Sequence, residues 1–162
     1  MKIYIDADAC PVKQEVYRVA ARFKLHVTVV SNTYMRVPDN RLITPVIVDD
    51  GPDAADNWIV ENSAQDDIVV TADIPLASRS LKKGACVISP SGKLFTDDNI
   101  GQILATRNLM ADLRDAGEVT GGPAPFTKKD RSSFLQQLDE LIHSILRKSP
   151  AHSDFTSFNE GE

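Results

Sequence analysis

The feature of this sequence that most constrains its fold is the stretch 1–11, where a short apolar run stops abruptly at two acidic residues. Residues 3–5 (Ile-Tyr-Ile) are good strand formers, and Asp6 and Asp8 follow with one residue between them. Pro11 suits the first turn of a helix, because the N–H that proline lacks would have no partner there. The stretch therefore predicts a buried strand, an acidic turn carrying a functional site, and a helix.

The rest of the chain repeats this alternation of short apolar runs with helical periodicity. Further strands are predicted at 26–30, 46–48, 67–72 and 86–88, and helices at 12–24, 54–64, 75–83, 100–113 and after a capping box at Thr127 and Asp130. Residues 34–45 contain two prolines and no clear period, so we interpret them as a loop with at most a short strand at 42–43. Strands that alternate with helices predict an α/β fold, in which a mostly parallel sheet is covered on both faces.

Composition limits the class of protein. The 162 residues, 42% of them hydrophobic, fit a single domain, which we place at 1–148; the polar segment 149–162 is expected to be a disordered tail. A net charge of −5 argues against a protein that coats DNA through a broad basic surface. No apolar run approaches the roughly 20 residues of a membrane span, and nothing resembles a signal peptide. With two cysteines and no CxxC pair, a reducing cytoplasm is the expected compartment.

Aspartates follow several of the predicted strands. They are Asp6 and Asp8, Asp49 and Asp50 with Asp53 and Asp56 just beyond, Asp73, and, less regularly, Asp97 and Asp98. In a doubly wound sheet ligands bind at the carboxyl ends of the strands, so these side chains are expected to converge. Converging carboxylates raise one another's pKa unless a cation compensates them, and such oxygen ligands suit Mg²⁺ or Mn²⁺. The chemistry that needs this arrangement is phosphoryl transfer or phosphodiester hydrolysis.

Some of these aspartates also have a purely structural explanation. Asp53 and one of Asp97 or Asp98 have helix capping as an equally good reason to be there. Asp6, Asp8 and Asp73 are harder to explain in this way, because they end apolar strands that should be central and capping does not need two acids after the first.

Polar residues near these ends are candidates for substrate contacts. Ser31 and Asn32 either bind phosphate or simply turn the chain, with turn formation favoured. Arg36, together with Arg41, either lies in solvent or grips a phosphate backbone. Cys10 lies beside the site, but without a partner that would activate it we interpret it as a buried thiol.

Four segments of the chain resemble the YaiI/YqxD family of small bacterial proteins. They are I-D-A-D-A-C-P at 5–11, D-A-A-D-N at 53–57, V-T-A-D-I-P-L-A at 70–77 and T-G-G-P at 120–123. Because that family is related by fold to the PIN-like nuclease domains, the resemblance implies a three-layer α/β/α sandwich that gathers carboxylates around Mg²⁺ or Mn²⁺ to cleave RNA or DNA. By position, it implies acidic site residues at Asp6 and Asp8, at Asp56 on a helix and at Asp73, with Asp97 or Asp98 a looser match.

Three functions remain open from the sequence. In the first, a nuclease acting on RNA or single-stranded nucleic acid, Asp6, Asp8 and Asp73 are catalytic and hold the metal, and Asp56 completes the cage or orients water. The second is a phosphomonoesterase of the haloacid-dehalogenase kind, with Asp6 as nucleophile and Lys82 or Lys83 as the lysine it requires. The third is a non-catalytic module that binds nucleotide or a protein partner. Ser31, Asn32 and Arg36 are the expected substrate contacts.

Overall fold

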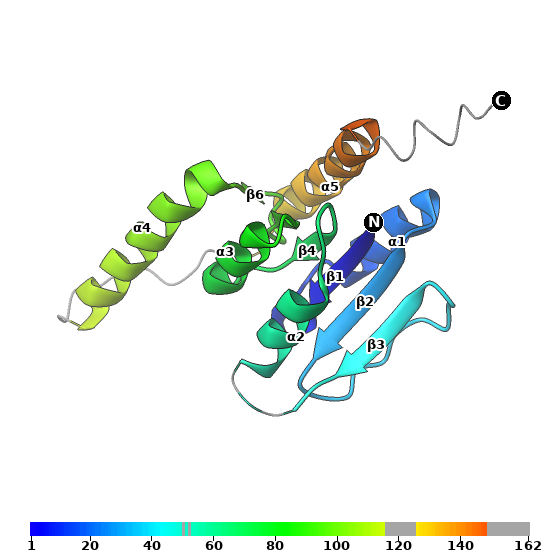
Figure 1. The fold of residues 1–162 in the computed structure, drawn as a ribbon, viewed down its shortest axis with the longest axis horizontal. Coiled ribbons are helices and arrows are strands. Elements are labelled where there is room, and N and C mark those ends of the chain that lie inside the picture. Colours follow the sequence, from blue (N-terminus) through cyan, green and yellow to red (C-terminus); the bar gives the residue numbers. More distant parts are fainter. Residues whose placement is uncertain (50, 52, 116–125, 149–162) are drawn as a thin grey trace.

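The computed structural model describes residues 1–49, 51, 53–115 and 126–148. Within them, one sheet has the strand order β3-β2-β1-β4-β5-β6 (Figure 1). The strands are β1 (Lys2–Asp6), β2 (His26–Ser31), β3 (Ile43–Ile47), β4 (Ile68–Val70), β5 (Cys86–Ile88) and β6 (Leu94–Phe95). All neighbouring pairs are parallel except β5 and β6, which are antiparallel. The carboxyl ends of β1 to β5 therefore share one edge of the sheet, which we call the carboxyl edge.

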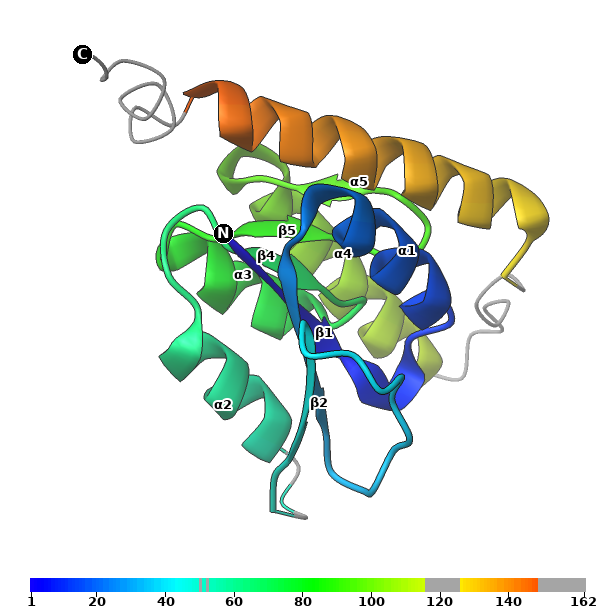
Figure 2. The same cartoon turned by 90° about the vertical axis from the view of Figure 1, so that its right-hand side faces the viewer.

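Helices cover both faces of this sheet. They are α1 (Lys13–Phe23), α2 (Ala54–Asn62), α3 (Ile74–Lys82), α4 (Asp97–Asp115) and α5 (Lys128–Lys148), with a short 3-10 helix, η1 (Ala7–Ala9), after β1. Figure 2 shows α1 on the opposite side of the sheet from α2 and α3. Successive strand residues point to opposite faces, so Ile3 and Ile5 pack in the core under α1 and α5, whereas Tyr4 packs in the core under α2 and α3. The α/β fold and its three layers are those expected from the sequence.

The helices on the α1 side follow their sequence pattern. Val16 and Val19 of α1 are fully buried, and the apolar stripe of α5, which includes Phe134 and Leu138, packs in the same core. The predicted capping box of α5 is present, since the Thr127 and Asp130 side chains each accept a hydrogen bond from the other residue's backbone N–H, at 3.1 and 3.0 Å.

The structure corrects two predicted boundaries. Residues 44–45 belong to β3 and not to a loop, so the short strand allowed at 42–43 and the strand predicted at 46–48 are one; Pro45 is tolerated because β3 is an edge strand that pairs with β2 alone. Helix α4 begins at Asp97, earlier than predicted, because Thr96 and Asn99 form a reciprocal cap with hydrogen bonds of 3.2 and 2.9 Å. The prediction from apolar periodicity missed the first turn of α4, because the residues of that turn are polar.

Some sequence predictions fall outside the described residues. These are the strand-end residue Asp50, the irregular segment at 118–125 with the T-G-G-P motif, and the tail at 149–162. The extent of the domain, 1–148, stays a prediction. Of the helices that the structure does describe, none is both long enough and apolar enough to cross a lipid bilayer.

Candidate functional site

The candidate site lies at the carboxyl ends of β1 and β4. These strands are neighbours, and from them the chain adds further strands in opposite directions along the sheet. The crossover helix that follows β1 lies on one face, and the helix that follows β4 lies on the other, so the two strand ends form a topological switch point, the position at which open α/β sheets have a crevice for ligands. Because Ile5 pairs with Val70, Asp6 at the end of β1 is a neighbour of Thr71, the first residue after β4. This pairing brings together two acidic segments that are far apart in the sequence.

Thr71 joins the two strand ends. Its side chain is buried, and its hydroxyl donates to Asp6 Oδ2 at 2.9 Å while accepting from the Asp73 backbone N–H at 2.9 Å. The hydroxyl therefore fixes the Asp6 carboxylate and the entry into α3 at the same time. Sequence reasoning missed this residue, because a threonine in a β-branched run was interpreted only as a strand former; its place directly before Ala-Asp was the available signal.

Asp73 has a structural role as well as a place at the switch point. It is the N-cap of α3, and its Oδ1 accepts from the Leu76 backbone N–H at 2.9 Å. Asp53, for which capping was expected, occupies the N-cap position of α2 but makes no capping hydrogen bond through its side chain. The expectation that Asp97 or Asp98 caps α4 is wrong, because both lie inside the helix and Thr96 supplies the cap.

Asp56 projects from the first turn of α2 and is half-buried. Burial, and after it the charges of Asp73, Asp6 and Asp53, raise its pKa to about 6, while Arg79 opposes them. Arg79 is held over α2 by a 2.9 Å hydrogen bond to Asn57 Oδ1. This arginine was not among the sequence candidates, because no local pattern connects it with α2.

Asp6 and Asp8 complete the group. Burial raises the pKa of Asp6, the Thr71 hydroxyl lowers it, and the charges of Asp73 and Asp8 raise it. Asp8 is exposed on η1, where its Oδ1 accepts from the Asn32 backbone N–H at 3.4 Å. We call Asp6, Asp8, Asp56 and Asp73 the acidic cluster; the charges of Asp8 and Asp73 act on Asp6, and those of Asp6 and Asp73 act on Asp56, so Asp6 links the four.

The expected substrate residues lie on the neighbouring strand end. The Ser31 hydroxyl is buried and donates to the Thr33 carbonyl at 2.6 Å, and the Asn32 amide donates to the Asp49 carbonyl at 2.8 Å. Both side chains thus close loops, as the turn-forming alternative requires. Arg36 is exposed further along the same loop. A role for these three in substrate binding stays a prediction.

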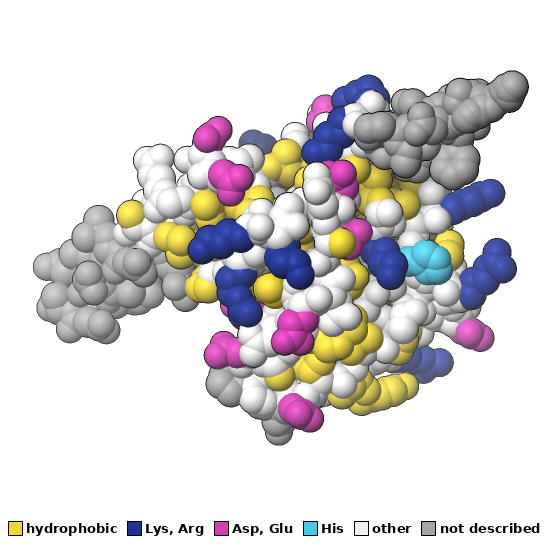
Figure 3. Space-filling model, in the orientation of Figure 1, with side chains coloured by type: hydrophobic (Ala, Val, Ile, Leu, Met, Phe, Trp, Pro, Cys, Tyr) yellow, Lys and Arg dark blue, Asp and Glu magenta, His cyan; other side chains and the backbone are white. Residues whose placement is uncertain are grey.

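Charge around the site is unevenly distributed. In Figure 3, Lys and Arg side chains gather over α3, while acidic side chains lie over and beside α2. Lys13, at the start of α1, uses its ammonium group to bind the carbonyls of Ala7 and Cys10, at 3.3 and 2.9 Å, and so fastens η1. Burial also raises the pKa of the Cys10 thiol, which agrees with its interpretation as a buried small side chain and not a nucleophile.

The donor set suits a hydrated ion better than a tightly caged one. Within the described ranges, no group of three or more His, Cys, Asp or Glu side chains is arranged to hold a metal directly. Burial raises the pKa values of Asp6 and Asp56, neighbouring carboxylates raise them further, and Arg79 opposes this rise at Asp56. Mg²⁺ keeps several of its waters and takes only one or two carboxylates, so these residues fit such an ion.

Comparison with known proteins places the chain in a family. Residues 4–144 match the family model described as "Uncharacterized BCR, YaiI/YqxD family". A UPF0178 protein of Bradyrhizobium sp. (strain ORS 278) is 58% identical over 149 residues, covering 92% of this chain and 91% of the relative. A UPF0178 protein of Nitrobacter winogradskyi is 56% identical over 151 residues, covering 93% and 96%. No solved structure matches the chain. The family-model match and these identities show that the chain belongs to the YaiI/YqxD family.

Proposed function

We propose that this protein is a metal-dependent nuclease with a PIN-like domain, which hydrolyses phosphodiester bonds of RNA or single-stranded nucleic acid with Mg²⁺ or Mn²⁺. The observation that carries the proposal is the convergence of the acidic cluster at the switch point, with the pKa of Asp56 raised to about 6 and that of Asp6 raised by burial. Uncompensated carboxylates destabilise a fold, so their concentration at one switch point favours a site that binds a cation.

Each carboxylate has a part in this proposal. Asp6, Asp8 and Asp73 are catalytic and would hold the ion, one or two of them directly and the rest through its waters, with Asp6 kept in one orientation by the Thr71 hydroxyl. Asp56, whose pKa of about 6 lets it exchange a proton near neutral pH, accepts the proton of the attacking water. When bound, the ion supplies an activated water and stabilises the charge on the leaving oxygen.

The surroundings favour an unpaired strand as substrate. Tyr34, in the loop after β2, is 79% exposed, which is unusual for a large aromatic side chain. An exposed ring of this kind stacks on an unpaired base without regard to sequence, and the neighbouring Arg36 can neutralise a phosphate. Ser31 and Asn32 shape the loop that presents both residues.

The test is cleavage of generic RNA and single-stranded DNA by the metal-depleted full-length protein, with and without added Mn²⁺ or Mg²⁺. Wild type should cut only with the metal. Asp6→Asn should lower the rate by about 100-fold or more, because it removes a carboxylate that both binds the ion and faces the substrate.

The matched control is Glu140→Gln, which removes an exposed carboxylate from α5 and should leave the rate unchanged. Equal cleavage by wild type and Asp6→Asn, purified in the same way, would assign the activity to a contaminant and overturn the proposal. Absence of both cleavage and metal binding in wild type would favour the non-catalytic module.

The phosphomonoesterase alternative lacks its expected lysine. Lys82 is the last residue of α3 and Lys83 follows it, whereas Asp73 caps the other end of the same helix. At 1.5 Å per residue, these lysines lie about 14 Å along the helix from the acidic cluster. The assignment of Lys82 or Lys83 to the site is therefore wrong, and no observation favours this alternative over the nuclease.

A further inference from the structure

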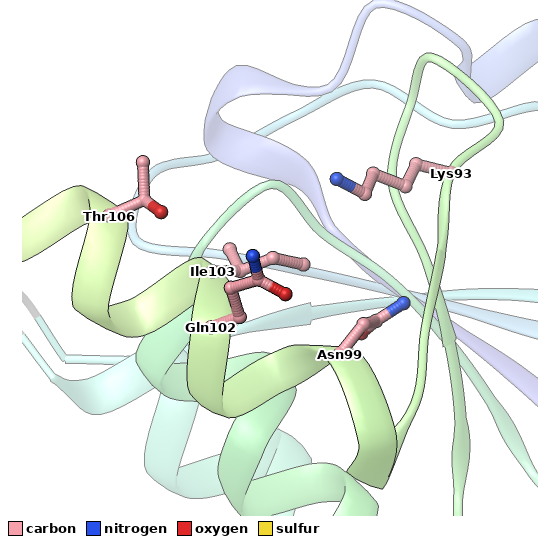
Figure 4. A pocket seen from close by; sticks show the side chains of 5 residues that line it. All are labelled: Lys93, Asn99, Gln102, Ile103 and Thr106. Carbon is pink, nitrogen blue, oxygen red and sulfur yellow. The ribbon is translucent and has the colours of Figure 1, made fainter.

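A pocket outside the acidic cluster lies between the β5–β6 turn and α4. It has a volume of about 500 Å³ and is lined by Lys93, Asn99, Gln102, Ile103 and Thr106. Figure 4 shows the Lys93 side chain extending from the turn toward α4, which contributes the other four residues. We call it the Lys93 pocket.

The Lys93 pocket shares the carboxyl edge with the acidic cluster. Thr71, which holds Asp6, donates its backbone N–H to the Ile88 carbonyl at 3.1 Å, and Ser89 donates its backbone N–H to the Lys93 carbonyl at 2.8 Å. Lys93 is thus two strand positions from Thr71, or about 10 Å at the usual spacing between strands. A substrate that lies along this edge would meet both sites.

The turn that carries Lys93 is fixed by its surroundings. The Ser89 side chain accepts from the Lys93 backbone N–H at 3.0 Å, and the Ser89 carbonyl accepts from Gly92 at 2.9 Å. Gly92 has a φ of +92°, and a Cβ there would lie 2.8 Å from the Ser133 carbonyl group of α5. The lysine is therefore presented from a backbone that is packed in place, which reduces the ordering cost of binding a ligand.

The lining specifies the chemistry of the ligand. Lys93 is exposed and, within the described part of the chain, forms no ion pair, so its ammonium is available for an anion. Gln102 and Thr106 are exposed neutral hydrogen-bonding side chains, and Ile103 offers an apolar surface. Asn99 lines the pocket without offering a free hydrogen-bonding group. Its side-chain oxygen accepts from the Thr96 N–H at 2.9 Å, and its side-chain nitrogen donates to the Leu94 carbonyl at 3.0 Å.

We propose that the Lys93 pocket binds one nucleotide unit of the substrate, next to the phosphodiester that the acidic cluster attacks. Lys93 binds its phosphate, Ile103 packs against the base or sugar, and Gln102 and Thr106 bond polar edges. A lone phosphate ion would leave most of about 500 Å³ unfilled, whereas a nucleotide uses the cation, the neutral polar groups and the apolar side chain together. This inference rests on the proposed nuclease function and names the position of its substrate.

The test measures binding to the metal-free full-length protein, so that it does not depend on cleavage. Uridine 5′-monophosphate and adenosine 5′-monophosphate are titrated by calorimetry, with uridine and inorganic phosphate as the two partial ligands. The nucleotides should bind at least about tenfold more tightly than either part. Lys93→Ala should weaken nucleotide binding about tenfold or more, and Lys93→Arg should restore most of it, because a hydrogen bond to a charged group is lost and regained.

The matched control is Lys82→Ala, which removes an exposed lysine from the end of α3, away from the carboxyl edge, and should not change the affinity. Equal affinity of wild type and Lys93→Ala, or inorganic phosphate that binds as tightly as the nucleotides, would overturn the inference. Asp6→Asn, which should not cleave, separates this inference from the nuclease proposal. Binding that depends on Lys93, found without any cleavage, supports the pocket alone. Cleavage by wild type without binding that depends on Lys93 rejects the pocket alone.

Discussion

The acidic cluster and the Lys93 pocket occupy the same edge of the sheet, but they are built in opposite ways. The acidic cluster draws its carboxylates from β1, η1, α2 and the cap of α3, and Arg79 is the cation that opposes their effect on Asp56. The Lys93 pocket has one cation and several neutral polar side chains. The carboxyl edge thus has an acidic region beside a region with one exposed lysine, and the phosphodiester and metal ion that we propose would need both.

The largest expected effect concerns the backbone that presents Lys93. Gly92→Ala should lower the free energy of unfolding by about 3 kcal/mol, because the new Cβ would meet the Ser133 carbonyl group at 2.8 Å in a backbone conformation that favours glycine. Denaturant unfolding measures the loss. Gly101→Ala in α4, where a Cβ would meet nothing within 4 Å, is the control and should be neutral or slightly stabilising. A loss of less than about 1 kcal/mol at Gly92 would mean that the turn gives way, so that the Lys93 pocket is not preformed.

A smaller effect is expected at Thr71, which joins Asp6 to the start of α3. Thr71→Val keeps the shape but removes the donor to Asp6 and leaves the Asp73 N–H without its acceptor, so the free energy of unfolding should fall by about 2 kcal/mol. Cleavage should fall about tenfold, because Asp6 is no longer held in one orientation. Thr71→Ser, which keeps the hydroxyl, should retain most of the activity. If the valine and serine variants behaved alike, Thr71 would have no positioning role.

The smallest effect tests whether the acidic cluster is short of positive charge. The folded protein holds the Asp56 proton up to a pKa of about 6, whereas the ordinary pKa of an aspartate is 3.8. Metal-free wild type should therefore lose stability as the pH rises through this interval, because the folded state binds more protons than the unfolded state. After allowing for solvent screening of this half-exposed group, the loss is about 1 kcal/mol.

Asp56→Asn should remove this part of the pH dependence and make the metal-free protein more stable than wild type at pH 7. Thermal unfolding at several pH values measures the difference, with Glu140→Gln as control. Asp6, whose pKa is also raised, contributes in the same direction, so part of the slope should remain in the variant. A variant less stable than wild type at pH 7 would show that Asp56 is compensated in the folded protein.

Much of the architecture follows from patterns that are local in the sequence. Residues 3–5, the strand at 86–88 and the capping box at Thr127 all lie where their patterns predict them. These features depend on side-chain alternation, helical spacing or a polar group three residues away, and each is settled within a few residues. Pro45 in β3 was missed because the reason it is tolerated, an edge position, is a property of the whole sheet.

The candidate site was only partly accessible to the same reasoning. The aspartates at strand ends were found, because parallel strands bring their carboxyl ends to one edge. Thr71, Arg79 and Lys93 were missed, since each acts on a group that belongs to another element. Which aspartate caps a helix was also misjudged, because a cap depends on the backbone geometry at the helix start and not on residue type alone.

By itself, the sequence determined the alternation of strands and helices and the acidic residues that end the strands. Both features depend only on the pattern of residues that are close together in the sequence. Only the tertiary structure decided that β4 lies beside β1, which places Asp73 next to Asp6, and that the β5–β6 turn packs on α5 and holds Lys93 at the same edge. Strand order and register minimise the free energy of the whole packed chain, and no local segment contains that information.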